Sequence, residues 1–232
     1  MRVPSLLFTA LFLLGFTADK ADVSGWSFVI SKDAETGVST VTMPVREGVT
    51  AIAFTLRPGS CMGNDCENDR ERIELKQAQY QTEGETWWYG WSIYVPEEFV
   101  SIWPGRTFLG QFHQEGGPPA MLFSLEPTGL VFETRFARGV EPVLIPARAL
   151  KGRWHDIAVE VKWSKSSGHV KIEIDGVTLV DRAQQTMSED RVYFKFGIYR
   201  AHLSRAALQR LPVQTVIYDR LRRASSKDEI MR

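Results

Sequence analysis

Short segments rich in β-branched and aromatic residues follow one another along most of this chain, and turn residues separate them. No long helical periodicity, internal repeat or low-complexity tract interrupts the pattern. Asp175-Gly176, between two such segments, is typical of a hairpin turn, and residues 201–208 fit a short helical turn. The expected strands are residues 26–31, 38–43, 50–56, 70–77, 87–95, 107–114, 120–125, 130–136, 154–163, 169–174, 177–180, 191–200 and 214–222. So many strands without intervening helices predict an all-β domain of two packed sheets, a sandwich or jelly roll.

The N-terminus has the layout of a secretory signal peptide. Arg2 precedes an apolar run at residues 6–16, and small residues follow at Thr17 and Ala18. The run is shorter than the roughly 20 apolar residues that span a membrane. We therefore expect residues 1–21 to be removed, with cleavage near Ala18 or Ala21. The remainder, residues 22–232, is expected to form one domain that is secreted or periplasmic and has no membrane contact.

Two cysteines, Cys61 and Cys66, lie in a loop rich in Gly, Asn and Asp. In an oxidising compartment this spacing predicts a local disulfide that shapes the loop. A metal site is the weaker alternative, because no histidine lies nearby. The same loop, residues 63–69, carries Asp65, Glu67 and Asp69, whose oxygens suit a structural calcium ion. The sequence does not separate that site from an ordinary acidic turn.

The chain carries 28 basic and 28 acidic residues, so its formal charge is balanced. A nucleic-acid partner or a membrane surface would usually select a basic protein, and neither is expected. A polyanionic ligand remains possible, but it would need a locally positive cleft on this neutral protein.

Side-chain alternation places polar, titratable residues on one face of four expected strands and apolar residues on the other. Ordinary solvated faces are rich in Lys, Glu, Thr and Ser, whereas these faces also hold Gln, His, Arg and Tyr, which bind sugars and transfer protons. A solvated sheet face is the alternative interpretation. The residues expected to share the polar faces are Arg70, Arg72, Glu74 and Lys76; Leu109, Gln111 and His113; Glu133 and Arg135; and Tyr193, Lys195, Gly197 and Tyr199.

Four motifs occur in order along the chain and together resemble one enzyme family. They are residues 70–75 (RERIEL) after the cysteine loop, residues 88–96 (WYGWSIYVP), Gln111-Phe112-His113, and residues 195–200 (KFGIYR). The chain resembles the polysaccharide lyases that include the glucuronan lyases and, more distantly, heparin lyase I. The resemblance covers about residues 54–218. It implies a concanavalin A-like β-jelly roll that cleaves an anionic, uronic-acid polysaccharide by β-elimination.

The resemblance also implies roles for individual residues. Such lyases line their cleft with a histidine on a central strand and with a Lys-x-x-x-Tyr strand, which match His113, Lys195 and Tyr199. Elimination needs a neutralised carboxylate, a base and an acid. Tyr199 is expected to be the acid and, in one alternative, also the base. His113 is expected to be the base or a partner of the carboxylate.

The remaining expected site residues bind or orient the substrate. Gln111 and Arg72 are candidates to neutralise the carboxylate, and Lys195 and Arg135 to hold flanking uronates. In an alternative interpretation Arg72 and Glu74 form an ion pair that orients the cleft wall. Trp103 could stack on a sugar at the rim. The elimination chemistry requires no cofactor.

Other classes of function have weaker support. A jelly-roll hydrolase that retains configuration needs two carboxylates roughly 5 Å apart. The nearest candidate string, Glu173-Ile174-Asp175-Gly176, is better explained as a turn. A carbohydrate-binding module would keep the fold but would not need both His113 and Tyr199. The sequence contains no nucleophile elbow, phosphate loop or His/Cys metal cluster. Glucuronan is the first-choice substrate, alginate fits the same groups, and a monomer is the default assembly.

Overall fold

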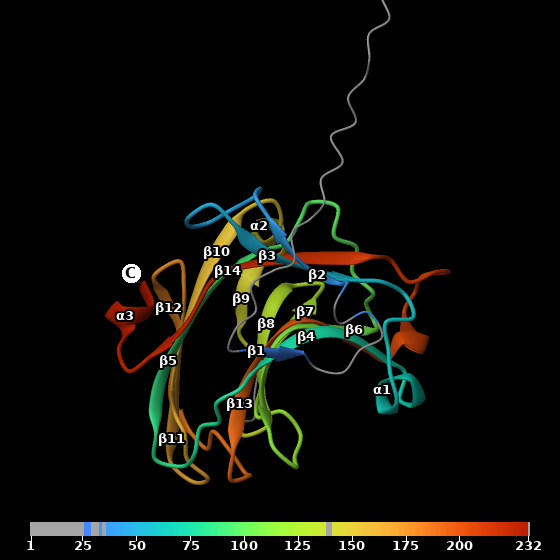
Figure 1. Ribbon diagram of the computed structural model, residues 1–232. Helices are drawn as coiled ribbons and strands as arrows, with labels where there is room; N and C mark the ends of the chain where they lie inside the picture. Colours follow the sequence, from blue (N-terminus) through green and yellow to red (C-terminus); the bar gives the residue numbers. More distant parts are fainter. Residues whose placement is uncertain (1–25, 29–32, 34–35, 138–140, 232) are drawn as a thin grey trace, which may run out of the picture.

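Two seven-stranded antiparallel sheets face each other and enclose one hydrophobic core (Figure 1). The computed structural model describes residues 26–28, 33, 36–137 and 141–231, with the backbone alone at 26–28. The expected signal peptide, residues 1–21, lies outside the described residues. The sandwich architecture confirms the predicted all-β jelly-roll class.

The strands of each sheet are far apart in sequence, as in a jelly roll. The first sheet has the order β1 (Trp26–Phe28), β4 (Arg70–Gln77), β13 (Val192–Ala201), β6 (Arg106–Gln114), β7 (Met121–Glu126), β8 (Gly129–Thr134) and β9 (Val143–Pro146). The second has the order β12 (Val177–Gln184), β11 (Gly168–Ile174), β10 (Trp154–Lys162), β5 (Thr86–Tyr94), β14 (Gln214–Ala224), β3 (Ala51–Leu56) and β2 (Val38–Val41). Short helical turns occur at α1 (Asn64–Glu67), α2 (Ala147–Leu150), η1 (Leu203–Arg205) and α3 (Lys227–Met231).

Aromatic rings from both sheets fill the centre of the sandwich. Phe112 packs on Tyr89 of the opposite sheet with 4.8 Å between ring centroids, and Trp91 contacts Phe123 at 5.1 Å. These rings are nearly or completely buried. Edge-on packing of this kind adds stability to the burial itself, so the core holds the two sheets in a fixed relation. Strands that present residues on the outer face of the first sheet therefore have a rigid support.

The strict alternation predicted for β6 is wrong at Leu109. Leu109 is 1% exposed and belongs to the core, whereas Phe108 lies beside Tyr199 on the outer face. The pairing of β6 with β7 shifts between Phe108 and Gly110, so one extra residue interrupts the ladder. Such a bulge changes which face the following residues occupy. The outer face of β6 is consequently formed by Arg106, Phe108, Gln111 and His113.

Gly197 of β13 is required by its backbone. Its φ of +127° is unfavourable for residues with a side chain, and a Cβ there would lie 2.3 Å from the Ile73 carbonyl oxygen of β4. The buried Tyr218 hydroxyl lies 2.8 Å from the carbonyl oxygen of Gly197 and 2.5 Å from that of Leu109, and these two acceptors share its one proton. The irregular positions on β13 and β6 are thus fixed from the second sheet.

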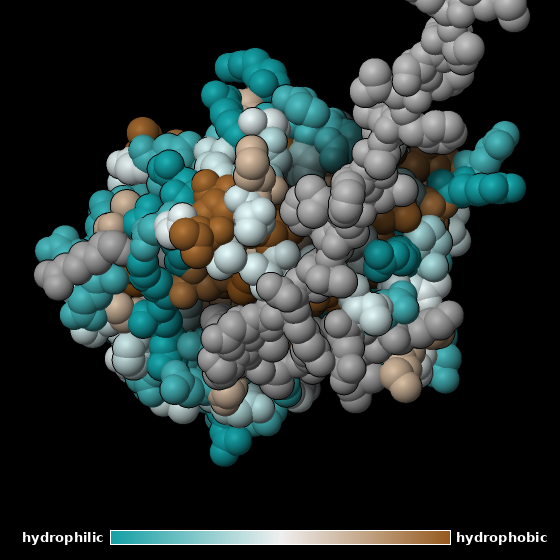
Figure 2. Space-filling view, turned by 45° about the horizontal axis from the view of Figure 1, so that its top comes forward, coloured by the Kyte–Doolittle hydropathy of each residue, from teal (hydrophilic) through white to brown (hydrophobic). Residues whose placement is uncertain are grey.

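The outer face of the second sheet is also partly covered. Ile230 of α3 is buried with Trp88 and Ala158 and covers part of this face. Figure 2 shows apolar residues gathered in the middle of one side of the molecule, with hydrophilic residues around them. Among the described residues, no helix has the length and apolar character to cross a bilayer.

Candidate active site

Three neighbouring strands, β4, β13 and β6, bring most of the predicted site residues together. Cross-strand register places Tyr199 opposite Arg72 on β4 and opposite Phe108 on β6. It also places Tyr193 opposite His113. These side chains point away from the core because they alternate with buried apolar residues. The central strand, β13, carries the motif at residues 195–200 and pairs with β6, which carries Gln111-Phe112-His113. The fold therefore brings together two motifs that lie about 80 residues apart in the sequence.

A cleft of about 400 Å³ lies over these strands. Of the predicted site residues, four line it: Arg72, Gln111, His113 and Tyr199. The other lining residues are Arg70, Phe108, Gly117, Pro118, Pro119, Leu122, Ala201 and His202. A cleft of this size holds a small ligand or one segment of a larger one.

The Tyr199 ring is held between two neighbours. Phe108 stacks on it with 5.4 Å between centroids and a 23° angle between the planes. The Arg72 guanidinium lies 4.2 Å from the ring centroid, a cation–π geometry. Burial raises the pKa of Tyr199 above its ordinary value, against the opposing effect of Arg72 and Arg70. The phenol is therefore protonated at neutral pH and can donate a proton.

Arg72 and Glu74 form the ion pair expected as the wall of the cleft. The Arg72 Nη1 donates to Glu74 Oε2 at 3.0 Å. The other carboxylate oxygen, Oε1, accepts a 2.5 Å hydrogen bond from Gln111 Nε2. The Glu74 residue is only 1% exposed. Nearly complete burial makes such a satisfied polar network rigid. It holds the Gln111 amide and the Arg72 guanidinium at fixed positions beside Tyr199.

His113 has a defined tautomer. Its Nδ1 lies 2.8 Å from the Gln114 carbonyl oxygen, which can only accept, so Nδ1 carries the proton and the lone pair is on Nε2. The ring stacks on Tyr193 at 5.5 Å. Burial, followed by the charge of Lys195, lowers the pKa of His113 from 6.5 to about 4. The imidazole is neutral near pH 7 and can therefore act as a base.

Lys195 lies directly opposite Lys76 on β4, and Gln111 is its partner on β6. Lys195 is 4% exposed, and burial lowers its pKa. The Nζ atoms of Lys76 and Lys195 lie 5.6 and 5.7 Å from the Tyr193 ring centroid. Within the described ranges neither ammonium has a carboxylate partner. This pair is a local excess of positive charge beside the cleft.

Four predicted substrate-binding residues are not among those that line the cleft: Glu74, Lys195, Trp103 and Arg135. Trp103 is 42% exposed in the loop between β5 and β6, and Arg135 is exposed after β8, over the Phe136 ring at 5.9 Å. Conversely, the cleft includes Arg70, Phe108 and His202, for which the sequence predicted no role in the site. Arg70 was already on the predicted polar face. His202 lies just after the end of β13, where strand alternation no longer predicts the direction of a side chain.

The predicted disulfide between Cys61 and Cys66 is present. It closes the loop that contains α1, but the loop acids have protein partners. Asp65 pairs with Arg72, and Asp69 accepts hydrogen bonds from the backbone and hydroxyl of Ser204. The loop calcium ion therefore stays a prediction, and these contacts give it no support.

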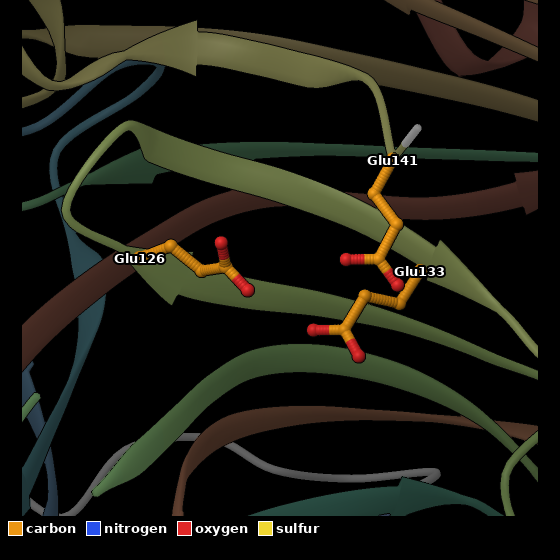
Figure 3. Close-up of side chains that lie close together, drawn as sticks. All are labelled: Glu126, Glu133 and Glu141. Atoms are coloured by element: carbon orange, nitrogen blue, oxygen red, sulfur yellow. The ribbon is translucent and has the colours of Figure 1, made fainter. Parts of the chain in front are cut away.

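A different acidic group lies on β7, β8 and the segment after it (Figure 3). Carboxylate oxygens of Glu126, Glu133 and Glu141 approach within 4.8 Å of one another. Arg106 donates to Glu133 and lies 4.0 Å from Glu126. Burial, with the neighbouring carboxylates, raises the pKa of Glu141. The group is thus partly neutralised by an arginine, and a cluster of acids alone does not indicate a metal.

The hydrolase candidate string is not in the cleft. Glu173 lies on β11 in the second sheet, where it pairs with Lys171 at 3.1 Å and with Lys227 of α3. Asp175 forms the predicted hairpin turn and accepts a 2.8 Å hydrogen bond from the ring of the buried His155. Both acids have structural partners, and Asp175 lies at the turn predicted there.

Comparisons with known proteins agree with this geometry. Residues 18–222 match the family model described as polysaccharide lyase. A search of curated protein sequences gives no match. Solved structures with a similar fold include the alginate lyase from Klebsiella pneumoniae (14% identity, 90% of this chain and 98% of that chain, TM-score 0.59). They also include the alginate lyase from Corynebacterium sp. (16% identity, 88% and 96%, TM-score 0.58).

The catalytic domain of the glycoside hydrolase family 131 protein from Coprinopsis cinerea is similar as well (14% identity, 87% of this chain and 84% of that chain, TM-score 0.63). At such identities the likeness of structures establishes the shared fold, and enzymes of different reaction types have it.

Proposed function

The chain belongs to the polysaccharide lyase family, and on that premise we propose that it cleaves a uronic-acid polysaccharide by β-elimination, with glucuronan as first-choice substrate. One observation carries the proposal. A neutral imidazole, His113, and a protonated phenol, Tyr199, line the same cleft. Elimination needs a base and an acid in these two states at the same pH.

The proposed reaction begins with the carboxylate of the uronate. Gln111 and the remaining donors of Arg72 would bind this group, which makes the C5 proton more acidic. His113 Nε2 takes the C5 proton, and the electron pair of the C5–H bond forms the C4–C5 double bond. The bond from C4 to the glycosidic oxygen breaks, and Tyr199 protonates the departing oxygen. Proton return from His113 to Tyr199, directly or through water, restores the starting state.

The division of roles between His113 and Tyr199 follows from their environments. A base must be unprotonated and an acid protonated, and burial shifts His113 and Tyr199 in these two directions. The alternative, in which Tyr199 serves as both base and acid, would need the phenolate. Burial disfavours that form, so the proposal assigns the base to His113.

An anionic substrate is supported by the charges around the cleft. Arg70 and Arg72 line the cleft, and Lys76 and Lys195 lie on the same strands beside it, whereas the carboxylates of Asp65 and Glu74 are both paired with Arg72. The whole chain has a formal net charge of zero, so this excess is local. A polymer with a carboxylate on successive sugars would neutralise it. Alginate has this property too, and the solved lyases above are described as acting on it.

Two further expectations are part of the proposal. The apolar run near the N-terminus supports secretion or a periplasmic location, and nothing in the reaction calls for a cofactor. A monomer with the cleft open to a long polymer fits the single-domain sandwich. The binding-module alternative keeps the fold but does not require the pairing of His113 with Tyr199.

The experiment is a panel of glucuronan, alginate, hyaluronan and heparin, followed by ultraviolet absorbance. Elimination leaves a 4,5-unsaturated uronate that absorbs strongly, whereas hydrolysis leaves none. A rise in absorbance with one polymer supports the lyase reaction and names the substrate. Binding to a polymer without any rise in absorbance would favour the binding module. New reducing ends without absorbance would favour hydrolysis.

A further inference from the structure

Asp65 lies in the disulfide loop that directly precedes β4, seven residues before Arg72. It belongs to α1, next to Cys66, and is 8% exposed. Both of its carboxylate oxygens face Arg72 of β4. Oδ1 accepts from Nη2 at 2.6 Å, and Oδ2 accepts from Nε. This is the bidentate arrangement in which an arginine and a carboxylate fix each other's orientation.

The other side of Arg72 is committed to Glu74 and Tyr199. Nη1 donates to Glu74 at 3.0 Å, and the guanidinium plane lies 4.2 Å from the centroid of the Tyr199 ring. Asp65 thus holds two of the three guanidinium nitrogens. Without Asp65, only Glu74 would bind the guanidinium, through Nη1, and the guanidinium plane could rotate about that single contact.

We propose that Asp65 is a positioning residue that, from the disulfide loop, holds the Arg72 guanidinium against the ring of Tyr199. The inference rests on the proposed function, because its importance for turnover requires Tyr199 to be the acid. Asp65 itself contacts no substrate in this view and acts through Arg72. The loop between Cys61 and Cys66 then contributes to catalysis by positioning Arg72.

The disulfide explains how a short loop can do this. A ring closed by Cys61 and Cys66 limits where α1 can lie. The Ser60 carbonyl oxygen accepts a 3.0 Å hydrogen bond from the Arg72 backbone N–H, which fastens the start of the loop to β4. The side chain and the backbone of Arg72 are therefore bound by the same loop.

Charge gives a second consequence. The titratable groups that face Tyr199 are Arg70, Arg72 and Glu74 from β4, Asp65 from α1, Arg106 beyond Phe108 on β6, and His202 after β13. The carboxylate of Asp65 contributes to the raised pKa of Tyr199, whereas Arg72 opposes it. Removing the Asp65 charge while Arg72 stays in place would lower the pKa of Tyr199.

The test compares Asp65→Ala and Asp65→Asn with Arg72→Ala and with the double variant Asp65→Ala/Arg72→Ala. Glu67→Ala, an exposed acid of the same helix, is the matched control. We expect Asp65→Ala to lower kcat on the order of 10–100-fold with a smaller change in KM, because misplacing a catalytic group costs that much. Asp65→Asn keeps one acceptor and should retain more activity. Glu67→Ala should match the wild type.

The double variant makes the test specific. If Asp65 acts through Arg72, the double variant loses no more activity than Arg72→Ala alone. The proposal would be overturned if Asp65→Ala lowered activity by the same factor with and without Arg72, or if Asp65→Ala alone kept full activity. A general loss of folding would lower activity in both backgrounds and would therefore count against it.

A readout without substrate separates this inference from the proposed function. The phenolate absorbance of Tyr199 is titrated as the difference between each protein and the same protein carrying Tyr199→Phe. Arg72 lowers the pKa of Tyr199 more than Asp65 raises it. If Asp65→Ala releases the guanidinium from the ring, the pKa of Tyr199 should therefore rise, whereas Asp65→Asn, which keeps an acceptor for Arg72, should lower it. A lowered pKa in Asp65→Ala would mean that Arg72 stays on the ring without Asp65 and would contradict the inference. If the wild type cleaves none of the polymers while the pKa of Tyr199 rises in Asp65→Ala as expected, the proposed function fails and the positioning of Arg72 by Asp65 stands.

Discussion

Lys76 and Lys195 face each other directly across β4 and β13, and the ring of Tyr193 lies beside both ammonium groups. Like charges in directly opposed positions destabilise a sheet. No carboxylate in the described part of the chain pairs with either lysine. A bound polyanion would relieve this repulsion. We therefore infer that the two lysines favour binding of an anionic ligand and destabilise the free protein.

The variant Lys76→Gln tests whether this lysine improves binding of the polymer and lowers the stability of the fold. Loss of one charge should raise KM for the anionic polymer several-fold and flatten its dependence on salt, because screening acts on the lost interaction. The same change should stabilise the fold by roughly 0.2–1 kcal/mol, since the repulsion is removed. Lys162→Gln, an exposed lysine at the end of β10, is the control. A stability loss together with an unchanged KM would contradict the role of Lys76.

Tyr199→Phe should remove the acid and leave the ring packing unchanged. The hydroxyl has no hydrogen-bond partner among the described residues, so the fold should keep its melting temperature. We expect kcat to fall by about 10²–10⁴-fold, the usual contribution of a general acid, while the affinity for the polymer changes little. Tyr94→Phe on the second sheet, where the ring packs on Trp154, is the matched control. Turnover at the wild-type rate would remove Tyr199 from the mechanism.

The pH dependence of kcat/KM should report His113. Its pKa is lowered to about 4, so the imidazole is neutral above that value and activity should fall as the pH drops through about 4. An acid limb near the ordinary value of 6.5 would contradict the lowering of this pKa by burial. Stability has the same sign: the unfolded chain binds a proton at higher pH than the folded one, so stability from this residue is lost between about 6.5 and 4. His113→Gln should abolish this dependence, whereas His169→Gln on β11 should not.

Gly197→Ala should disturb β13 through its backbone. The positive φ and the approach to the Ile73 carbonyl oxygen both oppose a Cβ atom. Gly176 in the β11–β12 turn also has a positive φ, but no atom lies within 4 Å of a Cβ placed there. Gly176→Ala therefore measures the backbone term alone, about 1–3 kcal/mol. Gly197→Ala should lower the melting temperature further and reduce kcat, and equal effects of the two changes would contradict the steric argument.

The sequence predicted the strands well because their alternation and turn residues are local signals. The bounds of β4 agree at both ends. The four-residue β9, which ends at Pro146, offered too short a pattern to detect. The extension of β12 to Gln184 was missed because this strand is largely exposed and lacks clear alternation.

The site was harder to predict where it depends on contacts between distant segments. Arg72, Gln111, His113 and Tyr199 were predicted from alternation and from the motif resemblance, and the structure places the four in one cleft. The bulge at Leu109 could not be inferred, because it depends on the pairing of β6 with β7. Asp65 was expected among calcium ligands, and only the folded loop shows that Arg72 is its partner.

The positive cleft also affects how molecules of this protein meet one another. With 28 basic and 28 acidic residues, a surplus of positive charge at the cleft must be balanced by a surplus of negative charge elsewhere on the same molecule. Near neutral pH there is then no net repulsion to keep copies apart, and opposite faces attract. Concentrated solutions at low ionic strength should become turbid, and added salt or a short oligouronate should clear them.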